Sequence, residues 1–166
     1  MRKCLCIPPT QHPRRSPMRL TTFSDYALRV LMYAASAGDR LITIEETAAA
    51  YSISKTHLMK IVNVLARNGY LVSIRGRSGG FRLAMPPERV NLGAVIRATE
   101  ADFALVECLA AGNQCVVTKP CKLPAILNEA LTSFLTVFDN YTLANIVLSP
   151  QAFGAAPQSP DRPFAS

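Results

Sequence analysis

The fold is decided by the stretch SKTHLMKIVNVLARNGYLVSIRGRSGGFRL, which covers residues 54–83. Its first part predicts a helix that Ser54 caps and that ends near Asn68, with Gly69 at the stop position. Apolar side chains recur there at spacings of three and four and share one helical face: Leu58, Ile61, Val62 and Leu65. The other side is left to solvent or to a ligand and carries Lys55, Thr56, His57, Lys60, Asn63 and Arg67.

The second part of this stretch predicts a two-stranded hairpin. Residues 70–74 form the first expected strand, residues 75–80 the turn, and residues 81–83 the returning strand. Three glycines in the turn supply the backbone freedom that a reversal of the chain requires. The whole stretch is therefore expected to be one helix followed directly by a β-hairpin.

Two more helices are predicted upstream of this unit. Thr22 can cap a helix over about residues 24–37, and a second helix covers about residues 44–51. A tight turn at residues 52–53 joins the second helix to the next one. Helix, short turn, helix and hairpin is the order of a winged helix-turn-helix, so the predicted fold class is mainly α with a small β-hairpin.

A further helix and a long C-terminal helix are predicted downstream. Asn91 can cap a helix that reaches about Glu100, and a cysteine-bearing loop follows it. The long helix runs from about Leu123 to Tyr141. Its apolar residues recur at spacings of three and four: Leu123, Leu127, Ala130, Phe134, Phe138 and Tyr141. Such a stripe can cover the chain's own core or pack against a second copy.

The chain is predicted to have four parts. Residues 1–17 contain four prolines without a periodic apolar pattern and are expected to be a disordered extension or a misassigned start. Met18 is the natural start that we suspect in the second case. Residues 18–85 form the winged helix-turn-helix, and residues 86–148 form the cysteine loop and the long helix. Residues 149–166 are rich in Pro, Ala and Ser and are expected to be a disordered tail.

Positive charge is concentrated in the N-terminal half. The net charge is +7, yet residues 86–166 carry five bases against seven acids, while residues 18–85 carry nine bases against four acids. A basic half suggests a polyanion such as DNA as the partner. The predicted DNA contacts lie on the third helix and on the hairpin: Ser54, Lys55, Thr56, His57, Lys60, Arg75, Arg77 and Ser78. For His57, a packing or capping role is an equal alternative.

Several other classes of protein are disfavoured. The sequence lacks the apolar run of a membrane span and the apolar core of a signal peptide, so a cytoplasmic location is expected. The two histidines, His12 and His57, lie in no recognisable catalytic motif. The glycine-rich segment leads into a hairpin and not into a helix, unlike a phosphate-binding loop. We therefore expect no enzymatic activity.

Three of the five cysteines form a cluster in the sequence. Their spacing is Cys108-x6-Cys115-x5-Cys121, in a loop that contains Gly112 and Pro120, whereas the other two cysteines lie in the N-terminal extension. Thiolates at such spacing can converge on one soft metal centre. Zinc with one additional ligand and a reversible disulfide are alternatives, and the spacing alone leaves zinc and an iron–sulfur cluster open.

Four segments together resemble one family. They are MRLTTFSDYALR (residues 18–29), RGRSGGFRL (residues 75–83), the three-cysteine loop and DNYTLANIV (residues 139–147). They resemble the winged-helix iron–sulfur transcription regulators that include IscR, RirA and NsrR, over about residues 18–148. The resemblance implies a homodimer joined by the long helix, a double-stranded DNA operator, and an iron–sulfur cluster held by Cys108, Cys115 and Cys121.

Within this family the chain looks most like the nitric-oxide-sensing repressors. Members that hold a two-iron cluster through a histidine carry it three residues after the last cysteine, where this chain has Pro124. The resemblance thus favours a 4Fe-4S over a 2Fe-2S cluster. It also implies that Asp25 of the other subunit is the fourth ligand, and that Arg29 pairs with Asp25 once the cluster is lost. Iron-responsive and cluster-status regulators of the same family, and a zinc-binding interaction module, are the alternatives.

Overall fold

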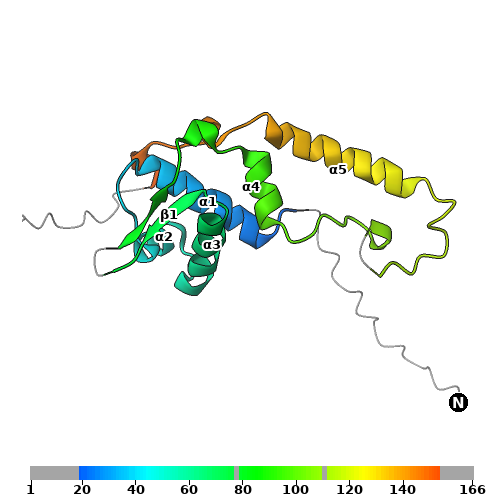
Figure 1. Cartoon of the computed structure of the whole chain (residues 1–166), viewed down its shortest axis with the longest axis horizontal. Coiled ribbons are helices and arrows are strands. Elements are labelled where there is room, and N and C mark those ends of the chain that lie inside the picture. Colours follow the sequence, from blue (N-terminus) through cyan, green and yellow to red (C-terminus); the bar gives the residue numbers. More distant parts are fainter. Residues whose placement is uncertain (1–18, 77–78, 110–111, 154–166) are drawn as a thin grey trace, which may run out of the picture.

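The computed structural model describes residues 19–76, 79–109 and 112–153. Along the chain the elements are α1 (Thr22–Ser36), α2 (Ile44–Tyr51), α3 (Lys55–Arg67), β1 (Leu71–Ile74), β2 (Gly80–Leu83), η1 (Pro87–Arg89), α4 (Leu92–Thr99), η2 (Glu107–Leu109), α5 (Leu123–Asp139), η3 (Leu143–Asn145) and η4 (Pro150–Phe153). Figure 1 shows α1, α2, α3 and the hairpin gathered at one end, with α4 beside them and α5 extending away from them. The predicted fold class is confirmed.

The cap of helix α1 lies one residue before the predicted one. Thr21 has an extended backbone, and its hydroxyl accepts the N–H of Ser24 at 3.3 Å, whereas Thr22 is already helical. The prediction that Thr22 caps this helix is therefore wrong by one position. The expected buried stripe is confirmed, since Ala27, Val30, Leu31 and Ala34 are all buried.

A single left-handed residue makes the turn between α2 and α3. Ser52 has a φ of 54°, and the N–H of Ile53 reaches back to the carbonyl of Ala48 at 3.1 Å. Ser54 then caps α3 as predicted, because its hydroxyl accepts the N–H of His57 at 3.3 Å. The turn is short, because α2 ends at Tyr51 and α3 begins at Lys55.

The hairpin is anchored to the segment in front of α2. Strands β1 and β2 are antiparallel and pair Leu71 with Leu83 and Ile74 with Gly80. Ile42 and Phe81 exchange two backbone hydrogen bonds of 2.9 and 2.8 Å. A Cβ on Gly80 would meet the carbonyl oxygen of Ile42 at 2.5 Å, so only glycine allows this close approach. The base of the hairpin is thus fixed to the helical core.

One hydrophobic core joins both sides of the predicted boundary at residue 85. Its large fully buried side chains include Phe81, Leu31, Ile42, Leu58, Ile61, Leu65, Val95 and Leu143. Val95 comes from α4 and Leu143 from η3, far along the chain from α1 and α3. The packing therefore continues through position 85, and the division of the chain into four parts stays a prediction.

Helix α5 contributes little to this core. Its 17 residues include none that is buried, although Phe138 packs against the edge of the core. A bidentate ion pair joins it to α4, since both guanidinium nitrogens of Arg97 lie 2.6 Å from the carboxylate oxygens of Asp139. A Cβ on Gly93 would overlap that carboxylate. The C-terminal end of α5 is therefore clamped onto α4.

The chain returns to α1 and α2 after α5. The ring of Phe153 in η4 lies edge-on to Tyr33 at 5.1 Å and to Tyr51 at 5.8 Å between ring centroids. Phe153 is thus half-buried against two aromatic rings, within the segment from residue 149 that we predicted to be a disordered tail, while the other residues of η4 are exposed. Residues 154–166 and the extension 1–17 lie outside the described residues. Within the described ranges, no helix is long and apolar enough to cross a membrane.

Candidate functional site

The N-terminal end of α3 is already engaged within the chain. The Lys55 ammonium lies 3.1 Å from a carboxylate oxygen of Glu45, and both side chains are largely exposed. The pKa of Glu45 is lowered by backbone hydrogen bonding and by this lysine. Lys55, a predicted DNA contact, would have to leave Glu45 before it could bind a phosphate.

His57 packs against α1. Its ring lies edge-on to Tyr26 at 5.5 Å and tilted to Phe23 at 6.4 Å between ring centroids, and the residue is half-buried. These contacts agree with the packing alternative for His57, while its role towards DNA stays a prediction. The backbone N–H of His57 also donates to the hydroxyl of the cap residue Ser54. His57 therefore connects the start of α3 to the first turns of α1.

The middle of α3 carries the free polar surface. Thr56 and Lys60 are exposed, as predicted for residues that contact DNA. Met59 is 49% exposed and Asn63 is exposed on the same helix. Asn63 lies on the face predicted to be left to solvent or to a ligand, although it is not among the predicted DNA contacts. The exposure of Met59 was not predicted, because an apolar side chain in a helix gives no such signal.

The hairpin forms the predicted wing, but its tip is only partly described. Arg75 is exposed directly after β1, and Gly76 has a φ of 122°, which only glycine adopts without strain. The predicted contacts Arg77 and Ser78 lie outside the described residues. The structure thus places one of the predicted wing cations, Arg75, on the surface beside α3.

The cysteine loop links η2 to α5. Cys108 and Cys121 are half-buried, Cys115 is exposed, and all three are free thiols. The loop is locally ordered around Cys115, because the side-chain Oδ1 of Asn113 accepts the backbone N–H of Cys115 at 2.8 Å. The hydroxyl of Thr118 donates to the carbonyl oxygen of Cys115 at 2.8 Å and accepts from the Asn113 amide at 2.9 Å.

The three thiols of this loop are suitable ligands for iron, but they are not arranged around a common point. Three thiolates are the ligands that iron–sulfur clusters use. Among the described residues, however, no group of three His, Cys, Asp or Glu side chains is close enough together to hold a metal ion. The structure therefore does not bring the predicted ligands Cys108, Cys115, Cys121 and Asp25 together within one chain.

Asp25 is paired with Arg29 one turn later on α1. The guanidinium Nε and Nη2 atoms of Arg29 lie 3.1 Å from the two carboxylate oxygens of Asp25. The same guanidinium lies 5.8 Å from the ring centroids of Tyr26 and Tyr51. This is the pairing expected of Asp25 when it binds no metal, and cation–π contacts hold the arginine in place.

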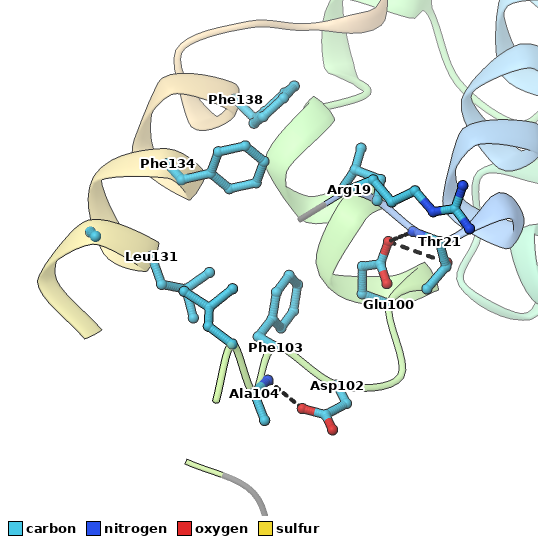
Figure 2. Close-up of a pocket in the computed structure, with 12 residues that line it drawn as sticks. Arg19, Thr21, Glu100, Asp102, Phe103, Ala104, Leu131, Phe134 and Phe138 are labelled. Atoms are coloured by element: carbon cyan, nitrogen blue, oxygen red, sulfur yellow. Dashed lines mark hydrogen bonds between the residues drawn. The ribbon is translucent and has the colours of Figure 1, made fainter. Parts of the chain in front are cut away.

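A groove separates the start of α1 from α5. It has a volume of about 600 Å³ and is lined by Phe103, Leu131, Phe134 and Phe138 on its apolar side. Figure 2 shows Glu100 at its polar edge, where the carboxylate accepts the backbone N–H of Thr21 at 2.7 Å and its hydroxyl at 3.2 Å. The end of α4 is thereby bonded to the cap of the helix that carries Asp25.

A family model matches residues 20–149, and its description is "Rrf2: Iron-dependent Transcriptional regulator". The chain belongs to the Rrf2 family of transcription regulators. It is 50% identical over 132 residues to the HTH-type transcriptional regulator NsrR of Bacillus subtilis, covering 78% of this chain and 90% of that protein. The NsrR of Geobacillus kaustophilus matches with the same identity and the same coverage.

Solved structures of other regulators share the fold. The T. potens IscR has a TM-score of 0.60 at 24% identity and covers 78% of this chain and 85% of its own. The oxidised form of Staphylococcus aureus CymR has a TM-score of 0.62 at 24% identity, covering 78% and 95%. At this identity the match concerns the winged-helix architecture. Family membership makes the chain a DNA-binding transcription regulator and not an enzyme, and similarity to NsrR implies an iron–sulfur cluster.

Proposed function

We propose that this protein is a homodimeric transcription repressor that senses nitric oxide through an iron–sulfur cluster. The observation that carries the proposal is the three-cysteine loop Cys108–Cys115–Cys121 in a chain 50% identical to NsrR. The absence of a histidine at Pro124, in the first turn of α5, favours a 4Fe-4S cluster with one ligand that is not a thiolate.

DNA binding is assigned to the exposed side of α3 and to the wing. Thr56 and Lys60 on α3 and Arg75 on the wing face solvent, and the surrounding half of the chain is basic. A recognition helix of this type enters the major groove, where the four base pairs are distinguishable. Arg77 and Ser78 belong to the same proposed interface. In a symmetric dimer, two such surfaces contact the two halves of a roughly palindromic operator.

Sensing is assigned to the cysteines and to Asp25 of the other subunit. When bound, the cluster supplies iron that reacts with nitric oxide. A carboxylate is a hard, weak ligand for such iron, so Asp25 is the ligand that leaves most easily. Its stable alternative partner is Arg29 of its own chain, in the ion pair seen here. When Asp25 exchanges the cluster for Arg29, the first turn of α1 loses its bond to the other subunit. Helix α1 packs directly on α3, so this change can reach the proposed DNA-binding helix.

The dimer is supported by the surface of α5. Leu123, Ile126, Phe134 and Val137 are each more than two-fifths exposed, which leaves an apolar helix face with no cover in the described chain. A second copy can bury this face, since apolar area removed from water stabilises association. The proposed fourth ligand, Asp25 of the other subunit, requires such a dimer.

An iron-responsive regulator is the nearest alternative, because the family description names iron dependence. The experiment that separates the two uses protein reconstituted anaerobically with iron and sulfide. Operator affinity is measured before and after addition of nitric oxide, and separately after removal of iron by a chelator. We expect nitric oxide to lower DNA affinity while total iron stays in the sample. Unchanged affinity with nitric oxide and loss with the chelator would assign the protein to iron sensing.

The cluster ligand outside the cysteine loop is tested by Asp25→Ala. The visible absorption of the variant should fade faster than that of the original protein under a chelator, because one ligand is missing. Far-UV circular dichroism should be unchanged, since Asp25 is partly exposed. Asp39→Ala provides a matched control at an exposed aspartate beyond α1. Equal fading in all three proteins would place the fourth ligand elsewhere, and zinc in place of iron would overturn the sensing proposal.

A further inference from the structure

Two side chains in the middle of α3 have no role in the folded chain. Met59 is 49% exposed, although apolar side chains of this size are usually buried. Asn63 is exposed, and its amide has no hydrogen-bonding partner in the described part of the chain. The two residues are four positions apart, so they lie next to each other on one helical face.

This face opens into a shallow hollow between α3 and the wing. Residues of α3, of the start of α2 and of the wing line the hollow: Ile44, Glu45, Met59, Val62, Asn63, Ile74, Arg75 and Gly76. Met59, Val62 and Asn63 form its α3 wall and exposed Arg75 lies on its wing side, while exposed Lys60 follows Met59 on α3. Cations at the edges and unpartnered groups between them match a duplex, which presents phosphates outside and base edges inside.

The neighbouring residues at the start of α3 are less available for reading bases. Lys55 is paired with Glu45, and the His57 ring is packed between Tyr26 and Phe23. Lys60 is a cation on a flexible stem and suits a phosphate as well as a base. Base reading by this helix is therefore assigned to exposed, uncharged side chains in its middle, Met59 and Asn63.

We propose that Met59 and Asn63 read A·T base pairs in the major groove of the operator half-site. Thymine presents the only apolar group in that groove, its C5 methyl, which an exposed methionine side chain can cover. Adenine presents N7 as acceptor and the N6 amino group as donor, which the Asn63 amide matches with one donor and one acceptor. The proposal rests on DNA binding by this protein and is independent of the signal that it senses.

The experiment begins by selecting the preferred duplex from a random pool with the reconstituted full-length protein. Each thymine of the selected half-site is then replaced by uracil, which removes only the C5 methyl group. We expect one position at which uracil weakens binding about fourfold, the factor for one buried methyl group. In Met59→Ala, thymine and uracil at that position should bind equally. Leu148→Ala removes an equally exposed apolar side chain far from α3 and should keep the difference.

Asn63 is tested in the same duplex with 7-deazaadenine, which lacks the N7 acceptor. Wild-type protein should bind about fivefold more weakly to one such duplex, since one of two hydrogen bonds is lost. Asn63→Leu should bind both duplexes equally. The inference is overturned if no thymine methyl affects binding, or if Met59→Ala keeps the same sensitivity to uracil. Nitric oxide should still release Met59→Ala from DNA, so failure of sensing and failure of base reading are distinguished.

Discussion

Helices α1 and α5 are of similar length and differ in what surrounds them. Of the 15 residues in α1, six are buried, among them Ala27, Val30 and Leu31. Of the 17 residues in α5, none is buried, although its apolar content is high. Helix α1 contacts α3, α4 and β2, whereas α4 is the principal neighbour of α5. One amphipathic helix is complete within a single chain, and the other has an apolar face that needs a second molecule.

This contrast indicates different roles for the N-terminal half, residues 18–85, and the C-terminal half, residues 86–148. The N-terminal half lies in the hydrophobic core, which it shares with α4 and η3, so its packing does not depend on a cofactor or a partner. The half with the cysteine loop has exposed apolar residues and no assembled ligand set, so its final geometry depends on dimerisation and on the cluster. A sensor needs one part whose structure responds to a ligand, and the less packed half meets that requirement.

The largest difference between the two halves is expected in the free energy of unfolding that is lost when an aromatic side chain in each is truncated to alanine. Phe81 is buried at the junction of the hairpin and the helices, so Phe81→Ala should lower the free energy of unfolding by about 3–5 kcal/mol. Urea unfolding followed by circular dichroism measures this loss.

Phe134→Ala is the matched change in α5, where the side chain is 42% exposed. In the monomer at high dilution it should cost less than about 1 kcal/mol, while it should weaken dimerisation in analytical ultracentrifugation. A loss for Phe134→Ala as large as that for Phe81→Ala would show that α5 packs within its own chain.

A smaller effect is expected where the two regions meet. Gly93 lies against the Asp139 carboxylate, so Gly93→Ala should push α5 away from α4 and cost about 1–3 kcal/mol. Hydrogen exchange should speed up at the C-terminal end of α5 and stay slow in α3. Ala94→Ser, at an exposed neighbouring position, is the control. Uniform acceleration across both helices would contradict a local clamp.

An alkaline titration tests the packing of the N-terminal half. Burial raises the pKa of Tyr51 to about 12, and its hydroxyl lacks a hydrogen-bonding partner in the described chain. Because the folded state holds the proton more tightly than the unfolded state, stability is full below pH 10 and falls between pH 10 and 12. Tyr51→Phe should reduce this fall and raise stability at pH 7 by up to about 1 kcal/mol. Tyr33 and Tyr70, whose pKa values are also raised by burial, contribute to the decline that remains.

The smallest effect on stability is expected in the cysteine loop. Val116 is 96% exposed, so Val116→Ser should change the free energy of unfolding by no more than about 0.5 kcal/mol. Thermal unfolding of the cluster-free protein measures it. A larger loss would mean that the loop is packed in the cluster-free dimer.

The sequence predicted the elements well where local rules decide them. Ser54 and Asn91 cap α3 and α4 as expected, because their side-chain oxygens accept free backbone N–H groups of the first helical turn. At α1, two consecutive threonines offered two caps, and the hydrogen bond that Thr21 donates to Glu100 adds a contact that no local pattern contains. Phe153 was missed for the same reason, since its partners Tyr33 and Tyr51 are about a hundred residues away.

The sequence identified the residues of the candidate site, but it could not predict how their side chains are arranged in space. Spacing singled out Cys108, Cys115 and Cys121, but convergence of their sulfur atoms depends on a cofactor and on a second chain. Among the predicted DNA contacts, the sequence could not reveal that Lys55 pairs with Glu45 or that His57 packs on Tyr26. Met59 was overlooked because its exposure follows from how α3 is oriented in the core.

The ion pair between Glu45 and Lys55 also affects how many cations leave the DNA when the protein binds. A lysine that stays with its own carboxylate neutralises no phosphate, so it releases no counterion from the duplex. The protein then behaves as if it had one positive charge fewer per subunit at the interface. While the pair holds, DNA affinity is correspondingly less sensitive to salt, through a carboxylate that lies on the preceding helix.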